Sequence, residues 1–225
     1  MPVNGLASSR SRSPLATDLW QPGLVNLTGR TSGNQQKHES GNPVQRHLIR
    51  RFHDEVVRLL EAVPHPAILD LGCGEGFVLE HLLASGIDAD LVGIDRSPAA
   101  IAAARERVGP AIDLVQADVT SLKDLPRLFD VVMMLEVLEH LDQPNITLDL
   151  LAELTTGHVI VSVPHEPFFR GLNMIRFKNL KRLGSDPEHV NHWTKRSFER
   201  LVGRRFEIVD RGRAFPWTLL LLEAR

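Results

Sequence analysis

The most constraining feature of the chain is an apolar segment that runs directly into a glycine turn. Ala67–Leu71 is apolar except at Asp70, and Gly72, Gly74 and Gly76 follow it before a second apolar segment begins at Phe77. Glycines let a ligand approach the backbone closely, and a helix N-terminus offers free N–H donors. A buried strand, a glycine turn and a helix in this order predict an α/β fold with a ligand site beside the first strand.

The glycine spacing argues against a dinucleotide site. Dinucleotide folds use G-x-G-x-x-G, in which the third glycine packs the helix against the strand. Here Gly76 follows Gly74 after one intervening residue instead of two. The turn by itself remains compatible with an adenosyl group or with no ligand at all.

From about residue 41 onward, helical and strand patterns alternate. The predicted strands are Ala67–Leu71, Leu91–Ile94, Asp113–Gln116, Phe129–Leu135, His158–Val163, Phe206–Val209 and Trp217–Glu223. The predicted helices are Val44–Ala62, Phe77–Ser85, Pro98–Val108, Leu138–Leu154, Pro167–Leu183 and one capped by Thr194 that ends at Gly203. This alternation predicts a parallel sheet with helices on both faces. The last two strands are too close for a helical crossover, so we expect them to pair antiparallel.

Acidic residues follow the second and third predicted strands. Asp95 ends Val92–Asp95, and its carboxylate can accept hydrogen bonds from both hydroxyls of a ribose; it could also cap the next helix. Asp118 follows the third strand and can accept from the exocyclic amine of adenine, or simply close a turn. With the glycine turn, these acids mark three successive strand ends, and open parallel sheets bind ligands at that edge.

These motifs together resemble the class I S-adenosylmethionine-dependent methyltransferases. The resemblance rests on Asp70–Gly76, Gly93–Asp95, Ala117–Asp118 and Phe129–Val132, and it covers about residues 44–225. It implies a Rossmann-like α/β fold: a seven-stranded, mostly parallel sheet with the last strand antiparallel and helices on both faces. It also implies S-adenosylmethionine as cofactor, with the methionine end over Asp70, Gly72 and Gly74, the ribose on Asp95, and the adenine beside Asp118 and Val119.

Composition fits one such domain preceded by a tail. Hydrophobic residues make up 43% and charged residues 24% of the 225 residues, which excludes disorder throughout. Residues 1–40 are polar and aperiodic and predict a flexible tail, with the domain at 41–225. No apolar run approaches the ~20 residues of a membrane span. A single cysteine, Cys73, excludes an internal disulfide, and we expect a cytoplasmic protein. Cys73 has no neighbouring base in the sequence and is not expected to be a nucleophile.

A candidate metal site follows the fourth predicted strand. Glu136, Glu139 and His140 are spaced to share one face of a helix, and carboxylates with an imidazole suit several divalent cations. The pattern resembles ubiquinone-pathway O-methyltransferases and small-RNA 3′-terminal 2′-O-methyltransferases, where it is linked to a divalent cation. In the RNA enzymes a later histidine joins it, and His189 holds the matching place here. Many metal-free methyltransferases carry a similar segment, so the metal set is a hypothesis.

The segment 165–194 is the predicted substrate-covering lid. It combines aromatic and basic residues, and residues 165–225 hold 13 basic against 7 acidic side chains. We therefore expect a small-molecule substrate that is apolar or anionic, with His140 and His165 as candidate catalytic bases. The predicted function is O-methylation of a small metabolite. The alternatives are a metal-assisted RNA 2′-O-methyltransferase, which the net charge of −2 disfavours, and a non-catalytic cofactor-binding partner subunit. The sequence leaves the oligomeric state open, and it predicts no integral membrane contact.

Overall fold

The computed structural model describes residues 42–119, 122, 128–165 and 190–225. The predicted tail, the predicted helix Pro167–Leu183 and most of the predicted lid lie outside these ranges. The described strands are β1 (Ala67–Leu71), β2 (Asp90–Asp95), β3 (Asp113–Gln116), β4 (Phe129–Leu135), β5 (Thr155–Pro164), β6 (Phe206–Arg211) and β7 (Trp217–Ala224). The described helices are α2 (Pro43–Glu61), α3 (Phe77–Ala84), α4 (Pro98–Val108), α5 (Pro144–Leu154) and α7 (Lys195–Val202), with short 3₁₀ turns η1 (Gly109–Ala111) and η3 (Leu138–His140).

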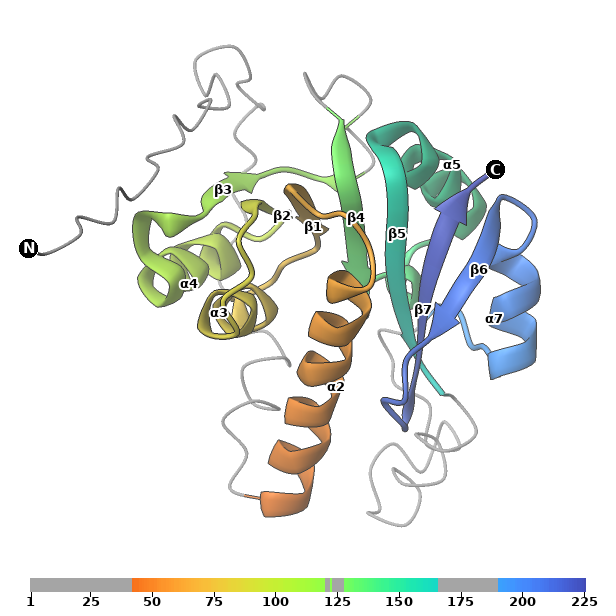
Figure 1. Cartoon of the computed structure of the whole chain (residues 1–225), viewed down its shortest axis with the longest axis horizontal. Coiled ribbons are helices and arrows are strands. Elements are labelled where there is room, and N and C mark those ends of the chain that lie inside the picture. Colours follow the sequence, from red (N-terminus) through yellow and green to blue (C-terminus); the bar gives the residue numbers. More distant parts are fainter. Residues whose placement is uncertain (1–41, 120–121, 123–127, 166–189) are drawn as a thin grey trace, which may run out of the picture.

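The seven strands form one sheet in the order β3-β2-β1-β4-β5-β7-β6 (Figure 1). Strands β1 to β5 pair parallel with their neighbours, whereas β7 runs antiparallel to both β5 and β6. This confirms the predicted Rossmann-like sheet and its reversed last strand. Because β7 is reversed, its first residue, Trp217, pairs with Pro164 at the end of β5. The start of β7 therefore lies at the edge where the parallel strands end.

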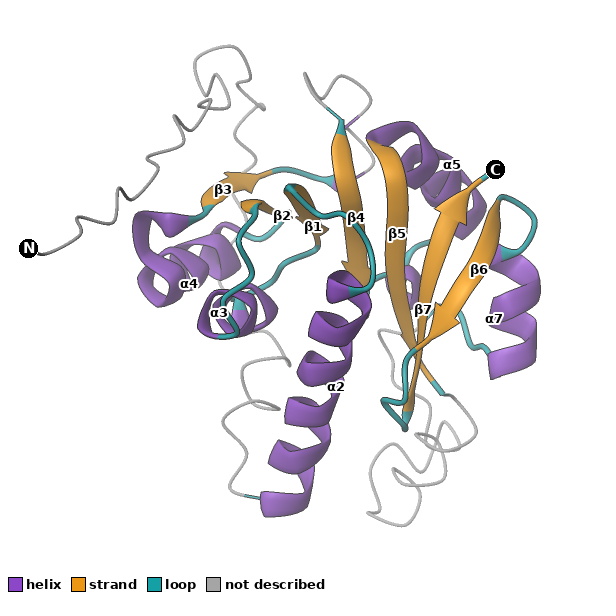
Figure 2. Ribbon diagram, in the orientation of Figure 1, coloured by secondary structure: helices purple, strands orange, loops and turns teal. Residues whose placement is uncertain are grey.

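Helices cover both faces of the sheet (Figure 2). Buried residues of α2, α3 and α4 pack on one face and those of α5 and α7 on the other, as two separate apolar clusters. Alternate strand residues supply the two clusters: Val132 and Met134 face one, and Val131 and Met133 face the other. This two-sided burial explains why β4 is almost continuously apolar, as expected of a central parallel strand.

Local signals set most element ends. Asn42 accepts a hydrogen bond from the Val44 amide at 3.0 Å and caps α2, and Thr194 caps α7 as predicted. The predicted helical segment Leu138–Leu154 forms in two pieces, the short turn η3 and then α5, which begins at Pro144 as expected for a proline in the first turn of the second piece. A residue before proline disfavours helical geometry, so Gln143 breaks the helix and Pro144 starts a new one.

Candidate functional site

The glycine turn after β1 adopts a backbone that only glycine accommodates readily. Gly72, Gly74 and Gly76 have φ of 82°, 54° and 78°, in the left-handed region. A Cβ on Gly72 would lie 2.4 Å from Val137 Cγ2. Any other residue at this position is therefore disfavoured both by the left-handed backbone and by this clash. At Gly76 a Cβ would lie 3.1 Å from Ala104 Cβ, which lets the start of α3 pack closely on α4. The turn is thus fixed from both sides, with its backbone close to the ends of β1 and β4.

Asp95 fastens the glycine turn to the end of β2. Its carboxylate accepts from the Gly74 amide at 2.9 Å through one oxygen and from the Ser97 amide at 2.8 Å through the other. A carboxylate has about four lone-pair sites, so each oxygen can accept a further hydrogen bond. Ser97, not Asp95, caps α4, with its hydroxyl accepting from the Ala100 amide. Asp95 is therefore placed to accept from a ligand while it holds the turn in position.

Asp70 is a buried carboxyl beside the same turn. It is only 2% exposed. Desolvation, with a further contribution from the nearby Asp95 carboxylate, raises the pKa of Asp70 from 3.8 to about 7. A cationic group bound at the turn would favour the ionised form of this carboxyl.

Cys73 is buried within the turn. Burial, together with the Asp70 and Asp95 carboxylates, raises the pKa of its thiol well above the usual range. Since the thiolate is the reactive form, this agrees with the expectation that Cys73 is not a nucleophile.

The adenine-side residues lie past the end of β3. Ala117 donates its amide to the Asp95 carbonyl at 3.0 Å, which ties this segment to the end of β2. Asp118 is exposed and Val119 is half-buried against the core. The predicted cofactor residues, from Asp70 to Val119, thus lie at or just after the ends of three adjacent strands, along one edge of the sheet.

The turn after β4 differs from the sequence prediction. Glu136 has a left-handed backbone with φ of 58° and precedes η3, so it does not share a helix face with Glu139 and His140. Its amide donates to the Ser162 hydroxyl at 3.0 Å, and that hydroxyl donates to the Glu136 carboxylate at 2.8 Å. These two bonds hold Glu136 against β5 and account for its unusual backbone. The prediction that Glu136 shares a helix face with Glu139 and His140 was wrong, because no local pattern in the sequence indicates the pairing of Glu136 with Ser162.

Glu139 and His140 are neighbours with different surroundings. Glu139 is 2% exposed, whereas His140 is exposed, and His140 Nε2 lies 3.9 Å from a Glu139 carboxylate oxygen. Within the described ranges, no group of three or more His, Cys, Asp and Glu side chains is arranged to hold a metal ion. The fourth residue of the predicted metal set, His189, lies outside those ranges.

The C-terminal end of the predicted lid returns to this turn. The amides of Val190 and Asn191 both donate to the Glu139 carbonyl, at 2.9 and 3.0 Å. The Asn191 side chain also donates to the Leu141 carbonyl at 2.6 Å. The C-terminal end of the predicted lid is therefore anchored at η3, beside Glu139 and His140.

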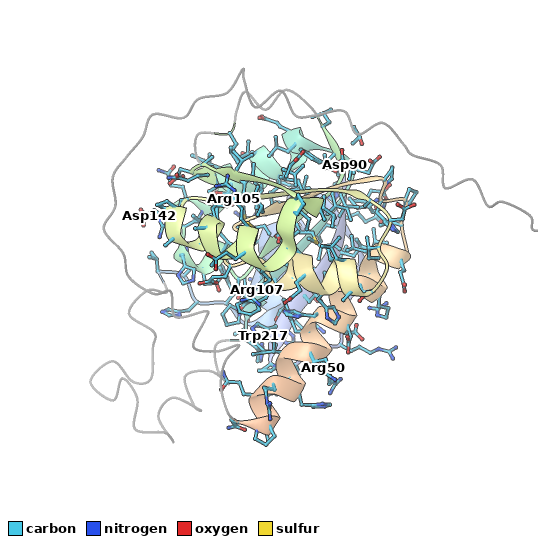
Figure 3. All side chains as sticks on the ribbon, turned by 90° about the vertical axis from the view of Figure 1, so that its left-hand side faces the viewer. Arg50, Asp90, Arg105, Arg107, Asp142 and Trp217 are labelled. Atoms are coloured by element: carbon cyan, nitrogen blue, oxygen red, sulfur yellow. The ribbon has the colours of Figure 1, made fainter. Side chains whose placement is uncertain are left out.

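A cavity of about 380 Å³ lies at the same sheet edge, beyond β5. His165, a predicted base, is among its lining residues, together with Lys195 at the start of α7 and Arg213, Phe215 and Trp217 near the start of β7. Figure 3 shows Trp217 close to α2. The sequence did not predict Lys195, Arg213, Phe215 or Trp217 as site residues. An antiparallel last strand, which was expected, does however bring Trp217 back to this edge of the sheet.

A comparison with known protein families identifies the family of this chain. The sequence profile of a methyltransferase domain family matches residues 44–208, which is well over half of the chain. The chain belongs to this methyltransferase domain family. It is a class I S-adenosylmethionine-dependent methyltransferase domain, as its motifs predicted. No helix in the described part of this methyltransferase domain is long and apolar enough to cross a membrane.

Curated relatives resemble part of the methyltransferase domain. The ubiquinone biosynthesis O-methyltransferase of Azorhizobium caulinodans is 36% identical over 120 residues, which cover 52% of this chain and 46% of that protein. The trans-aconitate 2-methyltransferase of an Acidovorax species is 43% identical over 79 residues, or 32% of this chain and 30% of that protein. The chain therefore spans less than half the length of these two relatives.

Solved structures share the fold. The magnesium protoporphyrin IX methyltransferase of Synechocystis with bound SAH superposes with a TM-score of 0.65 at 23% identity, covering 85% of this chain and 92% of that one. The methyltransferase domain of bacterial CtHen1-C superposes with a TM-score of 0.60 at 23% identity, covering 79% and 98%.

Proposed function

We propose that this methyltransferase domain transfers the methyl group of S-adenosylmethionine to an oxygen of a small metabolite. The observation that carries the proposal is the edge geometry. The glycine turn is fastened by Asp95, buried Asp70 lies beside it, and a cavity opens farther along the same edge. The names of the relatives support the substrate class, since they include an O-methyltransferase of ubiquinone biosynthesis and a trans-aconitate 2-methyltransferase.

The proposed roles follow from the chemistry of a sulfonium donor. The acceptor oxygen attacks the methyl carbon, the C–O bond forms as the C–S bond breaks, and S-adenosylhomocysteine leaves. The chain must bind and align the two reactants and accept the acceptor's proton. Asp70, Gly72 and Gly74 would hold the methionine end, Asp95 the ribose, and Asp118 with Val119 the adenine. His165 lines the cavity and His140 is exposed at η3, so both remain candidates for the base.

A methyl-transfer screen tests this proposal. The full chain is incubated with radiolabelled S-adenosylmethionine and with separate small-molecule and RNA fractions of a cell extract. We expect label in small molecules and a strong loss of label with Asp95→Ala. Label in RNA alone would favour the metal-assisted alternative. Cofactor binding without transfer to either fraction would favour the non-catalytic partner subunit.

One backbone contact supports the alternative of a metal-assisted RNA 2′-O-methyltransferase. Val190, the chain neighbour of His189, is hydrogen-bonded to the carbonyl of Glu139. If Glu136, Glu139, His140 and His189 hold a divalent cation, magnesium or manganese should bind saturably to the wild type and much more weakly to Glu139→Gln. RNA methylation that persists fully in chelator would contradict the metal role.

A further inference from the structure

The cavity beyond β5 has an uneven distribution of charge. Arg211 is paired with Glu199 at 2.7 Å, and Arg58 is paired with both Glu55 and Asp210 at 2.9 and 2.8 Å. The three carboxylates in these contacts are not among the residues that line the cavity. Among the described residues, no hydrogen bond or ion pair engages the Arg213 guanidinium or the Lys195 ammonium. Arg213 is close enough to interact electrostatically with Glu55 and Asp210, but its guanidinium donates a hydrogen bond to neither. The cavity is therefore lined by two cations that have no hydrogen-bonded carboxylate among the described residues.

The backbone of Arg213 is nevertheless held firmly. Its amide donates to a Glu55 carboxylate oxygen at 2.9 Å, and its carbonyl accepts from the Arg51 guanidinium at 3.1 Å. Both partners belong to α2, which runs beside β4 and β5 in Figure 1. The main chain is thus fixed while the guanidinium at its end stays available. A guanidinium presents paired N–H donors that match the two oxygens of a carboxylate.

Aromatic side chains form another part of the lining. Phe215 is 56% exposed, which is unusual for so large an apolar side chain, and its ring lies 6.3 Å from the His165 ring. Trp217 packs on Phe52 of α2 with ring centroids 5.1 Å apart (Figure 3). The cavity volume falls within the roughly 300–1,000 Å³ range of small-molecule sites. Aromatic walls favour a ligand with a ring, because aromatic surfaces prefer offset or edge contacts with other rings.

We propose that this cavity binds the methyl acceptor as a planar, carboxylate-bearing ring. The carboxylate lies on Arg213 and Lys195, and the ring lies against Phe215 and Trp217. His165 then faces the ring from the end of β5. This assignment rests on the proposed methyltransferase function, since the cavity shares the sheet edge with the glycine turn.

Benzoate is the test probe, with benzamide as its uncharged match. Each is titrated into the full chain, with and without S-adenosylhomocysteine, while NMR follows the Trp217 indole N–H. We expect saturable benzoate shifts, little response to benzamide, and binding roughly tenfold or more weaker in Arg213→Gln and in Lys195→Gln. Arg204→Gln is the matched control, because Arg204 is exposed just before β6, at the opposite edge of the sheet. It should bind benzoate as the wild type does.

The outcomes separate the two proposals. Calorimetry measures S-adenosylhomocysteine binding in the same samples. Binding of the cofactor product without benzoate binding, or equal binding of benzoate and benzamide, would overturn the acceptor site and leave the methyltransferase function standing. An equal loss of benzoate binding in Arg204→Gln would also overturn it. Benzoate binding without any cofactor binding would overturn the proposed function and, with it, the assignment of the cavity to a methyl acceptor.

Discussion

At the scale of single residues, Asp95 has two roles that a pair of variants can separate. The two carboxylate oxygens of Asp95 accept from the amides of Gly74 and Ser97. Asp95→Asn removes the negative charge and replaces one of these acceptors by an NH₂ donor. We expect S-adenosylmethionine binding to weaken by about 1–3 kcal/mol, which is roughly five- to 150-fold. Ser97→Ala is the control, since it removes the α4 cap at a cost of about 1 kcal/mol in stability but spares the carboxylate. Calorimetry showing the same affinity for Asp95→Asn as for wild type would refute the ribose assignment.

Asp70 predicts a specific pH dependence of folding. Its pKa is about 7 in the folded chain against 3.8 ordinarily, so between pH 4 and 7 the folded state holds a proton that the unfolded state has released. Stability of the ligand-free chain should therefore fall as pH rises through this window, by on the order of 4 kcal/mol. Denaturant unfolding at several pH values measures the free energy of unfolding of the wild type and of Asp70→Asn, and the difference between them should change with pH. An equal pH slope in both proteins would contradict the prediction.

At the scale of elements, the glycine turn offers a matched comparison. Gly72 and Gly86 have similar φ, 82° and 77°, but a Cβ meets Val137 only at Gly72. Gly86→Ala should cost about 1–2 kcal/mol of backbone strain, and Gly72→Ala clearly more. Adding Val137→Ala should recover part of the difference for Gly72→Ala but nothing for Gly86→Ala. Unfolding free energies of the wild type, the three single variants and the two double variants complete both double-mutant cycles. Additive costs of Gly72→Ala and Val137→Ala would show that the contact is relieved in another way.

Elements with strong local patterns were predictable from the sequence, and those set by distant contacts were not. β1, β3, β4 and α4 begin and end where their apolar runs, glycines and prolines predict. The placement of the predicted cofactor residues at one edge of the sheet followed from the alternation of strands and helices. Glu136 was misassigned because its conformation depends on Ser162, which lies 26 residues away. Arg213 and Lys195 were missed because the lining of the cavity depends on how α2, α7 and β7 come together.

At the scale of the whole molecule, Arg58 connects α2 to the hairpin formed by β6 and β7. It binds Glu55 within α2, Asp210 in β6 and the Arg211 carbonyl, and Glu55 in turn holds the Arg213 amide. Because these ion pairs are partly exposed, Arg58→Met should lower stability by only about 1 kcal/mol or less. It should, however, leave Glu55 and Asp210 free to approach Arg213 and compete with a bound carboxylate.

We therefore expect Arg58→Met to weaken benzoate binding several-fold while S-adenosylhomocysteine binding stays unchanged, since no described contact joins Arg58 to the glycine turn. NMR titration and calorimetry on one sample measure both quantities, and Arg105→Met is a control because Arg105 contacts β3 instead. If both affinities fell together, the two ends of the sheet edge would behave as one site. Independent responses would mean that the fold lets acceptor recognition change at the β6–β7 end without disturbing the cofactor turn.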